Sequence, residues 1–213
     1  MATRSEGKLR ELRPLFAAHG IAVIDLHAAG IAESSVADTL EIHATFEENA
    51  LAKARYFHAV SGRRTVADDS GLVVPALGGS PGVLSKRWSG RDDLKGQALD
   101  DENNRLLRER LGNTHDRSAY YVCAAAYVDG QREMTCRGEV HGRILDAPRG
   151  SGGFGYDPYF FSAELGGTFG EVRGDEKARV SHRARAFGAL VARLQADGVF
   201  PSGSGGTLDD GAE

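Results

Sequence analysis

The sequence predicts an α/β protein, because segments with helical periodicity alternate along the chain with short β-rich runs. The chain has 213 residues, of which 41% are hydrophobic, so it can bury a full core in one domain or in a domain with a small lobe. We assign residues 1–200 to a single domain. Residues 201–213 have the Gly/Ser-rich, acidic composition of a disordered tail, and we exclude them from the fold.

Composition and charge exclude several classes of protein. The formal net charge is -4, and the tail contributes three of the acidic residues, so the body is nearly neutral and a nucleic-acid polymer is not the expected partner. No apolar run is long enough to span a bilayer, and Met1 does not open a charged-then-apolar leader. We therefore expect a cytoplasmic protein with no membrane partner. The two cysteines form neither a metal motif nor a disulfide framework.

The first helix is expected from Leu9 to His19. Gly20 ends the periodic pattern, and a short apolar strand is expected from Ile21 to Leu26. The residues that share the apolar side of the helix are Leu9, Leu12, Leu15 and Phe16.

A capping box starts the second helix. Thr45 is followed three residues later by Glu48, and the helix is expected to run to about Val60. Asn49 and Lys53 are four residues apart on it and therefore share a face. From periodicity alone, a solvated face is the favoured interpretation of this pair.

A strand from Arg64 to Ala67 is expected to deliver Asp68, Asp69, Ser70 and Gly71. One interpretation of these four residues is an Asp-Gly type of turn. The other, which we favour, is a ligand site, because ligands of α/β proteins lie beyond the carboxyl ends of strands and a carboxylate there can hold magnesium.

Glycine and proline punctuate the middle of the chain. Val73 to Leu84 contains five such residues and is expected to be a loop. Asp100 to Leu111 is expected to be a helix, acidic at its start and ended by Gly112.

Two β-rich runs, from Tyr120 to Val128 and from Gln131 to Val140, flank Asp129-Gly130. An Asp-Gly pair is typical of a two-residue hairpin turn. The resulting register pairs Val128 with Gln131 and places Cys123 opposite Cys136 at a Cα separation of about 4.5 Å. In a reducing cytoplasm we expect two thiols in contact there and no disulfide.

The stretch from Ser151 to Pro158 has three glycines around Phe154. Glycine lets the backbone approach a ligand closely and leaves the aromatic ring free to stack on a flat group such as a nucleobase. Pro158 favours an extended Asp157, which would hold a carboxylate beside the ring. Taken alone, a glycine cluster before a proline is most often a turn.

Ser181 is a suitable N-cap for a helix that continues to a stop at Gly198, so His182 and Arg183 fall in its first turn. Cations at that end oppose the helix dipole by about 0.3–1 kcal/mol each, so stability does not explain them. The alternatives are a solvated surface pair and a site for an anionic or hydrogen-bond-rich ligand.

Five motifs, in order and spacing, resemble the inosine triphosphate pyrophosphatase family over residues 3–196. They are Thr45–Ala50 with Lys53, Ala67–Leu72, Gly79–Gly82 with Ser85 and Arg87, Gly152–Pro158, and Glu176–Lys177 with Ser181–Arg183.

The resemblance implies an elongated fold of two lobes around a long mixed β-sheet, with a nucleotide cleft between the lobes and usually a homodimer. It implies Mg²⁺-dependent hydrolysis of non-standard purine nucleoside triphosphates, namely ITP, dITP and XTP, to the monophosphate and pyrophosphate. Residues 1–200 would then be one nucleotide pyrophosphatase domain that removes deaminated purines from the nucleotide pool.

The resemblance also implies roles for individual residues. Asp69 would be the catalytic general base and a metal ligand, and Glu41 would be the second metal-site carboxylate. Phe154 would stack on the base, with His182 and Arg183 reading its edge. The remaining substrate-binding residues would be Thr3, Ser5, Lys8, Lys53, Ser70, Gly155, Tyr156, Asp157 and Lys177.

The chain departs from the family pattern at two places. Arg4 and Ser5 replace the glycine and asparagine that cradle the triphosphate, with only Met1 and Ala2 before Thr3 where the family has a strand. Ile42-His43 stands where Thr-Gly is common. Two alternatives follow: a catalytically weak nucleotide-binding or regulatory dimer, and a pyrophosphatase for modified pyrimidine nucleotides. We favour the purine enzyme, because the Asp-Asp-Ser-Gly and Phe154 motifs are intact.

Overall fold

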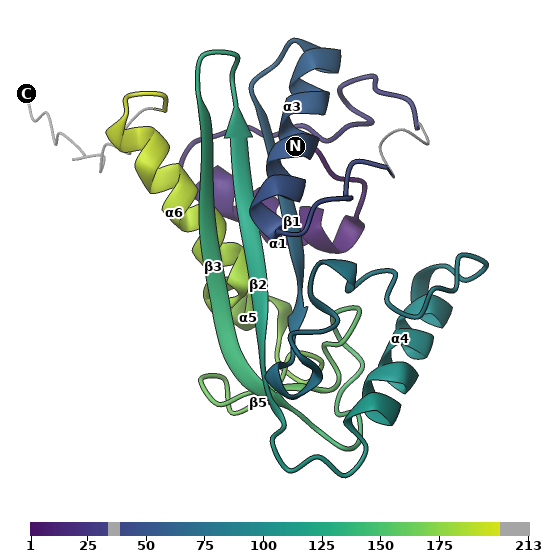
Figure 1. Ribbon diagram of the computed structural model, residues 1–213. Coiled ribbons are helices and arrows are strands. Elements are labelled where there is room, and N and C mark those ends of the chain that lie inside the picture. The colour runs from purple at the N-terminus through teal and green to yellow at the C-terminus, as the bar shows by residue number, and fades with distance from the viewer. Residues whose placement is uncertain (34–38, 201–213) are drawn as a thin grey trace, which may run out of the picture.

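The computed structural model describes residues 1–33 and 39–200 (Figure 1). The tail expected at residues 201–213 lies outside the described residues. The strands are β1 (Thr65–Val73), β2 (Ser118–Val128), β3 (Glu133–Ile144), β4 (Phe160–Ser162) and β5 (Gly167–Thr168). The helices are α1 (Glu6–Ala18), α3 (Phe46–Ser61), α4 (Gly96–Leu111), α5 (Gly174–Val180) and α6 (His182–Ala196), with 3-10 turns η1 (Pro75–Leu77) and η2 (Gly82–Leu84).

The sheet has the order β1-β2-β3-β4-β5. The long strands β2 and β3 run through the whole molecule (Figure 1). All pairings between these described strands are antiparallel, so the mixed sheet that the resemblance implied is wrong for this part of the chain. The α/β class and the two lobes are confirmed.

One lobe, here called the upper lobe, consists of α1, α3 and α6 packed on the two faces of the sheet around β2. Side chains alternate along a strand, so Cys123 and Ala125 face α1 and α6, whereas Ala124 and Ala126 face α3. These small residues are fully buried on both faces, which lets helices pack closely on each side of the strand.

The lower lobe has a separate apolar core. It joins α4, through Leu107 and Leu111, to the other end of the sheet and to the loops around β4 and β5. Figure 1 shows α3 and α4 beside opposite ends of the sheet. The sheet thus connects two lobes that each have their own apolar packing.

The predicted helices are present, and side-chain caps explain where α1, α3 and α6 begin. Ser5 caps α1, which therefore starts three residues before the predicted Leu9. The Thr45 hydroxyl accepts from Glu48 N and caps α3 as predicted, and Ser181 caps α6 by accepting from Ala184 N. Helix α4 begins at Gly96, four residues earlier than predicted.

The strand predicted from Ile21 to Leu26 is wrong. This stretch pairs with no strand in the described structure, although Ile21 and Val23 pack against the upper core. Its apolar character therefore reflects packing. The edge of β1 instead receives one backbone hydrogen bond from Ala2 N to Val66 O, 2.7 Å long.

The predicted hairpin register is also wrong, by two residues. The Asp129 carboxylate accepts from Gln131 N and Arg132 N, and only Gly130 has a positive φ, 86°. The turn therefore centres on Gly130 and Gln131, since both favoured turn types would need a positive φ at Asp129 if the turn centred on Asp129 and Gly130.

This shift separates the two cysteines across the hairpin. Cys123 lies opposite Gly138, and Cys136 lies opposite Ala125, so the expected thiol pair does not form. A glycine is required at position 138, opposite Cys123, because the backbone of α6 lies close to it. A Cβ there would come within 2.4 Å of the α6 backbone at His182 O and Ala186 N.

Asp68 and Asp69 lie within β1 and do not follow its end, which corrects the prediction that a strand stops at Ala67. They pair with Ala125 and Ala124 of β2. Because neighbours on a strand point to opposite faces, the two carboxylates face different helices. The segment after β1, predicted to be a loop, contains η1 and η2.

Candidate active site

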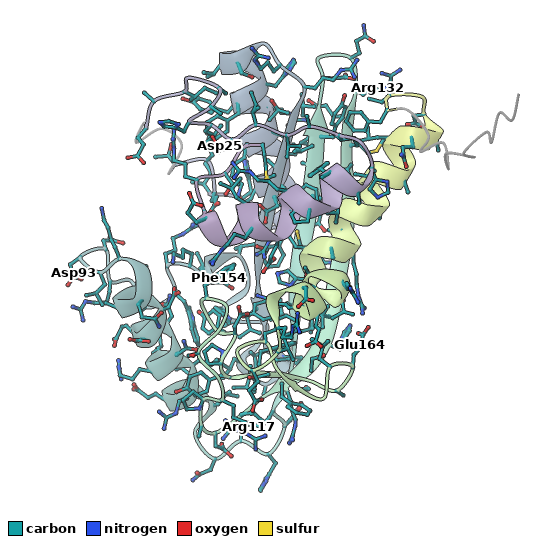
Figure 2. All side chains as sticks on the ribbon, turned by 180° about the vertical axis from the view of Figure 1, so that it is seen from behind. Asp25, Asp93, Arg117, Arg132, Phe154 and Glu164 are labelled. Carbon is teal, nitrogen blue, oxygen red and sulfur yellow. The ribbon has the colours of Figure 1, made fainter. Side chains whose placement is uncertain are left out.

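A cleft of about 640 Å³ lies between the lobes. Every predicted site residue except Asp157 and Lys177 lines it. Those residues are Thr3, Ser5, Lys8, Glu41, Lys53, Asp69, Ser70, Phe154, Gly155, Tyr156, His182 and Arg183. Figure 2 shows Phe154 beneath α1, on the lower side of the cleft.

Asp69 and Lys53 form the centre of a buried polar cluster under α3. Asn49 Nδ2 donates to Asp69 Oδ2 at 3.1 Å, and Lys53 Nζ lies 3.6 Å from Asp69 Oδ1 and 2.7 Å from Glu41 Oε1. The face that Asn49 and Lys53 share is therefore buried against β1, and the interpretation as a solvated face is wrong.

Burial and neighbouring charges shift the pKa values of the two carboxyl groups of this cluster, Asp69 and Glu41, in opposite directions. Burial, assisted by the charge of Glu41, raises the pKa of Asp69 although Lys53 opposes it. Burial also acts to raise the pKa of Glu41, but Lys53, Lys8 and Arg87 outweigh it and the net shift is downward. Asp69 is thus more basic than an ordinary aspartate, and Glu41 is less basic than an ordinary glutamate.

Asp68 points to the other face of β1 and joins two helices. Its Oδ2 lies 2.9 Å from Lys8 Nζ of α1 and 3.3 Å from Arg183 Nε of α6. Burial opposes ionisation, yet these cations hold the pKa of Asp68 well below its usual range. Sequence reasoning included Asp68 in a candidate ligand site but gave it no individual role, because nothing local indicates which cations reach it.

Arg183 is held on all three of its nitrogens. Besides Nε to Asp68, Nη1 donates to Glu11 at 2.5 Å and Nη2 donates to Ser70 Oγ at 2.9 Å. Glu11 also pairs with Lys177 at 3.0 Å. Glu11 was missed. Its position three residues after Lys8 on one face of a helix was the available signal.

The segment around Phe154 is fixed from below by Asp157. One carboxylate oxygen accepts from Phe154 N at 2.8 Å and from Lys177 Nζ at 2.7 Å. Lys177 Nζ and Arg183 Cζ lie 5.0 and 5.5 Å from the Phe154 ring centroid, within cation–π range. Asp157 and Lys177 therefore support the aromatic ring from outside the cleft lining.

Helix α4 holds the same segment from the lower lobe. Asp100 Oδ2 accepts from Gly155 N at 2.8 Å, and Asn104 Nδ2 donates to Gly155 O at 2.9 Å. Both residues were missed, although they continue the buried stripe of Leu107 and Leu111 along the helix. The feature of the sequence that could have identified them is the presence of polar residues within the apolar stripe of this helix.

His182 is buried and stacks on Tyr121, with ring centroids 4.7 Å apart and planes 9° from parallel. Neither ring nitrogen has a hydrogen-bond partner in the described structure. Burial, together with the nearby cations Arg183 and Lys177, holds the pKa of His182 well below its usual range. The imidazole is therefore neutral, with one donor and one acceptor that no described group pairs with.

The Ham1 family model matches residues 1–193 of the chain. The chain belongs to the Ham1 family. The resemblance to the inosine triphosphate pyrophosphatase family drawn from the five motifs is thereby confirmed.

Two relatives of this Ham1 chain carry the same name. It is 46% identical over 197 residues to a dITP/XTP pyrophosphatase of Burkholderia pseudomallei, covering 91% of each chain. It is also 46% identical to a protein of the same name from Aromatoleum aromaticum, covering 91% of this chain and 94% of the relative.

Solved structures of the family share its fold. A HAM1 protein from Coxiella burnetii is 32% identical, covering 91% of this chain and 96% of the other, with a TM-score of 0.78. A nucleoside-triphosphatase/dITP/XTP pyrophosphatase from Mycobacterium abscessus is 38% identical, covering 90% and 96%, with a TM-score of 0.68.

The Ham1 cleft contains two carboxylates, Asp69 and Glu41, that are candidate ligands for a divalent cation, although the described residues hold no group of three or more His, Cys, Asp or Glu side chains placed to bind a metal. Asp69 and Glu41 stand on either side of the Lys53 ammonium, so the two carboxylates already hold a positive charge between them. Mg²⁺ is usually bound by one or two carboxylates together with water and substrate phosphates.

No helix within residues 1–33 and 39–200 is long and apolar enough to span a membrane.

Proposed function

We propose that this protein hydrolyses non-standard purine nucleoside triphosphates, namely ITP, dITP and XTP, to the monophosphate and pyrophosphate. The observation that carries the proposal is the polarity of one cleft. A carboxylate–lysine cluster around Asp69 lies at one end, and an aromatic ring, Phe154, lies with buried hydrogen-bonding groups at the other. The name of the relatives, dITP/XTP pyrophosphatase, supports the same function.

The lower end of the cleft suits a purine with an oxygen at position 6. Phe154 offers a flat apolar surface next to the Arg183 guanidinium, and the buried His182 ring, whose nitrogens have no partner among the described residues, lies within the electrostatic range of that guanidinium. Hypoxanthine and xanthine carry a carbonyl where adenine carries an amine, so a fixed donor such as Arg183 favours them. A buried donor left unpaired by the wrong base produces the discrimination.

The upper end suits hydrolysis of a phosphoanhydride. Asp69, with its raised pKa, would orient a water and accept its proton during attack. Lys8 and Lys53 would neutralise phosphate charge, and Ser5, which caps α1, sets a helix N-terminus beside them. Mg²⁺, held by Asp69 and Glu41, would supply Lewis-acid stabilisation of the charge on the phosphates.

The setting of the reaction is part of the proposal. We infer that the enzyme works in the cytoplasm as a homodimer and removes deaminated purines from the nucleotide pool. Its family membership supports this, and light scattering of the purified chain tests the dimer.

The test is pyrophosphate release from ITP, XTP, dUTP, ATP and GTP with Mg²⁺. We expect release from ITP and XTP, lost on chelation and reduced by about 10²–10⁴-fold in Asp69→Asn, the range of general-base contributions. Asp93→Asn, at an exposed carboxylate that pairs only with Arg91 among the described residues, is the matched control and should keep full activity.

Other outcomes would replace the proposal. Binding of ITP without pyrophosphate release would favour the catalytically weak nucleotide-binding module, and a preference for dUTP would favour the pyrimidine enzyme. Ser5 counts against the weak module, because it preserves the cap of α1 where the family has asparagine.

A further inference from the structure

The cations that line the cleft are Arg4, Lys8, Lys53, Lys86 and Arg183. Four of them are neutralised: Lys8 pairs with Asp68, Lys53 with Glu41, Lys86 with Asp100, and Arg183 with Glu11. Arg4 differs, since it forms no ion pair with any residue that the structure describes. A triphosphate carries several negative charges, and this guanidinium has no described carboxylate to compete for it.

Arg4 is anchored along one edge only. Its Nη2 donates to Ile31 O at 2.9 Å and to Ala32 O at 2.7 Å. A guanidinium has five N–H donors in a fixed plane. Within the described chain, no acceptor takes the protons of Nε or Nη1, so the opposite side of the group is available while Nη2 stays bound.

The position of Arg4 is suited to an anion. Ala2 is tied to β1 by its hydrogen bond to Val66 O, and Ser5 is the N-cap of α1, so Arg4 lies in a short segment fixed at both ends. Thr3, Ser5 and Lys8 line the same wall. The helix N-terminus adds partial positive charge and free backbone N–H groups at this wall.

We propose that Arg4 is a phosphate-binding residue of this enzyme. Its Nε and Nη1 donate to the triphosphate while Nη2 remains on the carbonyls of Ile31 and Ala32. The inference rests on the proposed function of the cleft and deepens it. Glycine occupies this place in the family pattern, so the contact belongs to this chain and adds charge where the pattern relies on backbone alone.

The experiment compares Arg4→Gln, Arg4→Lys and the control Arg10→Gln, which removes the same charge from an exposed position of α1. Calorimetry measures binding of inorganic tripolyphosphate and of inosine, and steady-state assays give KM and kcat for ITP. We expect Arg4→Gln to weaken tripolyphosphate binding and raise KM by roughly tenfold for each charge-assisted hydrogen bond that is lost from Nε and Nη1. Inosine binding and kcat should stay within about twofold, Arg4→Lys should recover part of the affinity, and Arg10→Gln should match wild type.

Three results would overturn the assignment: unchanged tripolyphosphate binding in Arg4→Gln, an equal loss of inosine binding, or the same loss in Arg10→Gln. Melting temperatures of the variants verify that each is folded. Wild-type protein that binds tripolyphosphate through Arg4 yet releases no pyrophosphate from ITP would contradict the proposed function and leave the phosphate contact standing. If Arg4→Gln released pyrophosphate from ITP with unchanged KM and kcat, the phosphate contact would be contradicted and the proposed function would stand.

Discussion

Asp68 and Asp69 are neighbours in the chain, and the pKa values of their carboxyl groups are shifted in opposite directions. Both are buried, which disfavours the charged form. Asp68 meets Lys8 and Arg183, which outweigh burial, whereas Asp69 faces the negative Glu41 as well as Lys53. Strand alternation thus makes Asp68 a fixed counter-ion and leaves the pKa of Asp69 above its ordinary value.

Gly153 is the residue whose substitution should damage the base end most selectively. Its φ is +73°, and a Cβ would come within 2.0 Å of Asp157 Oδ2, which holds Phe154 N and Lys177. We expect Gly153→Ala to weaken inosine binding by about tenfold or more and to leave tripolyphosphate binding unchanged, since backbone strain and the clash act together. Calorimetry measures both ligands.

Gly155→Ala is the matched control for that change. Gly155 also has a positive φ, +63°, but a Cβ there meets nothing within 4 Å. Its loss of inosine binding should therefore be smaller, because only the strain remains. Equal losses in the two variants would show that the carboxylate of Asp157 does not position the ring.

At the scale of elements, α4 is more than a cover for the lower core. Asp100 accepts the Gly155 N–H, so Asp100→Ala leaves that donor without its partner and frees the segment that carries Phe154. We expect KM for ITP to rise by about three- to tenfold, with inosine binding weakened in parallel. Tripolyphosphate binding should not weaken, because the change also frees the cleft cation Lys86 from its ion pair with Asp100. Steady-state kinetics and calorimetry measure these quantities.

Asp101→Ala provides the comparison on the same helix. Asp101 is exposed and accepts from Gln97 only among the described residues. It should behave as wild type. A rise in KM in both variants would trace the effect to the charge or stability of α4, and the contact with Gly155 would lose its assigned role.

At the scale of the whole molecule, the two lobes and α6 meet at His182. The imidazole stacks on Tyr121 and is surrounded by Lys8, Lys177 and Arg183, with Asp68 as the opposing charge. Its folded-state pKa lies below the ordinary 6.5, so the unfolded chain binds the proton more readily. The contribution to stability is fully present above pH 6.5 and is lost as the pH falls below it.

We therefore expect the free energy of unfolding to decrease between pH 7 and pH 5, by at most about 1.4 kcal/mol per pH unit from this one group. His182→Phe keeps an aromatic ring against Tyr121 and removes the titration, so its stability should vary less over the same range. Urea unfolding at several pH values makes the comparison. Parallel curves for the two proteins would mean that other groups cause the loss.

The sequence by itself determined what depends on neighbours in the chain. The caps at Thr45 and Ser181 were predicted correctly, because a capping side chain bonds the backbone three residues away. The helical faces and the five motifs, with their family, were readable for the same reason. The motifs identify Asp69, Phe154 and Arg183 as candidate site residues, but they do not give the distances between these side chains.

Only the tertiary structure decided which partners meet. The hairpin register moved by two residues, because the Asp129 side chain competes for the turn. Glu11 reaches Arg183 across 172 residues, and Asp100 reaches Gly155 across 55. A buried charge takes whichever counter-charge the packing brings near, and that depends on how helices from both ends of the chain fold onto one sheet.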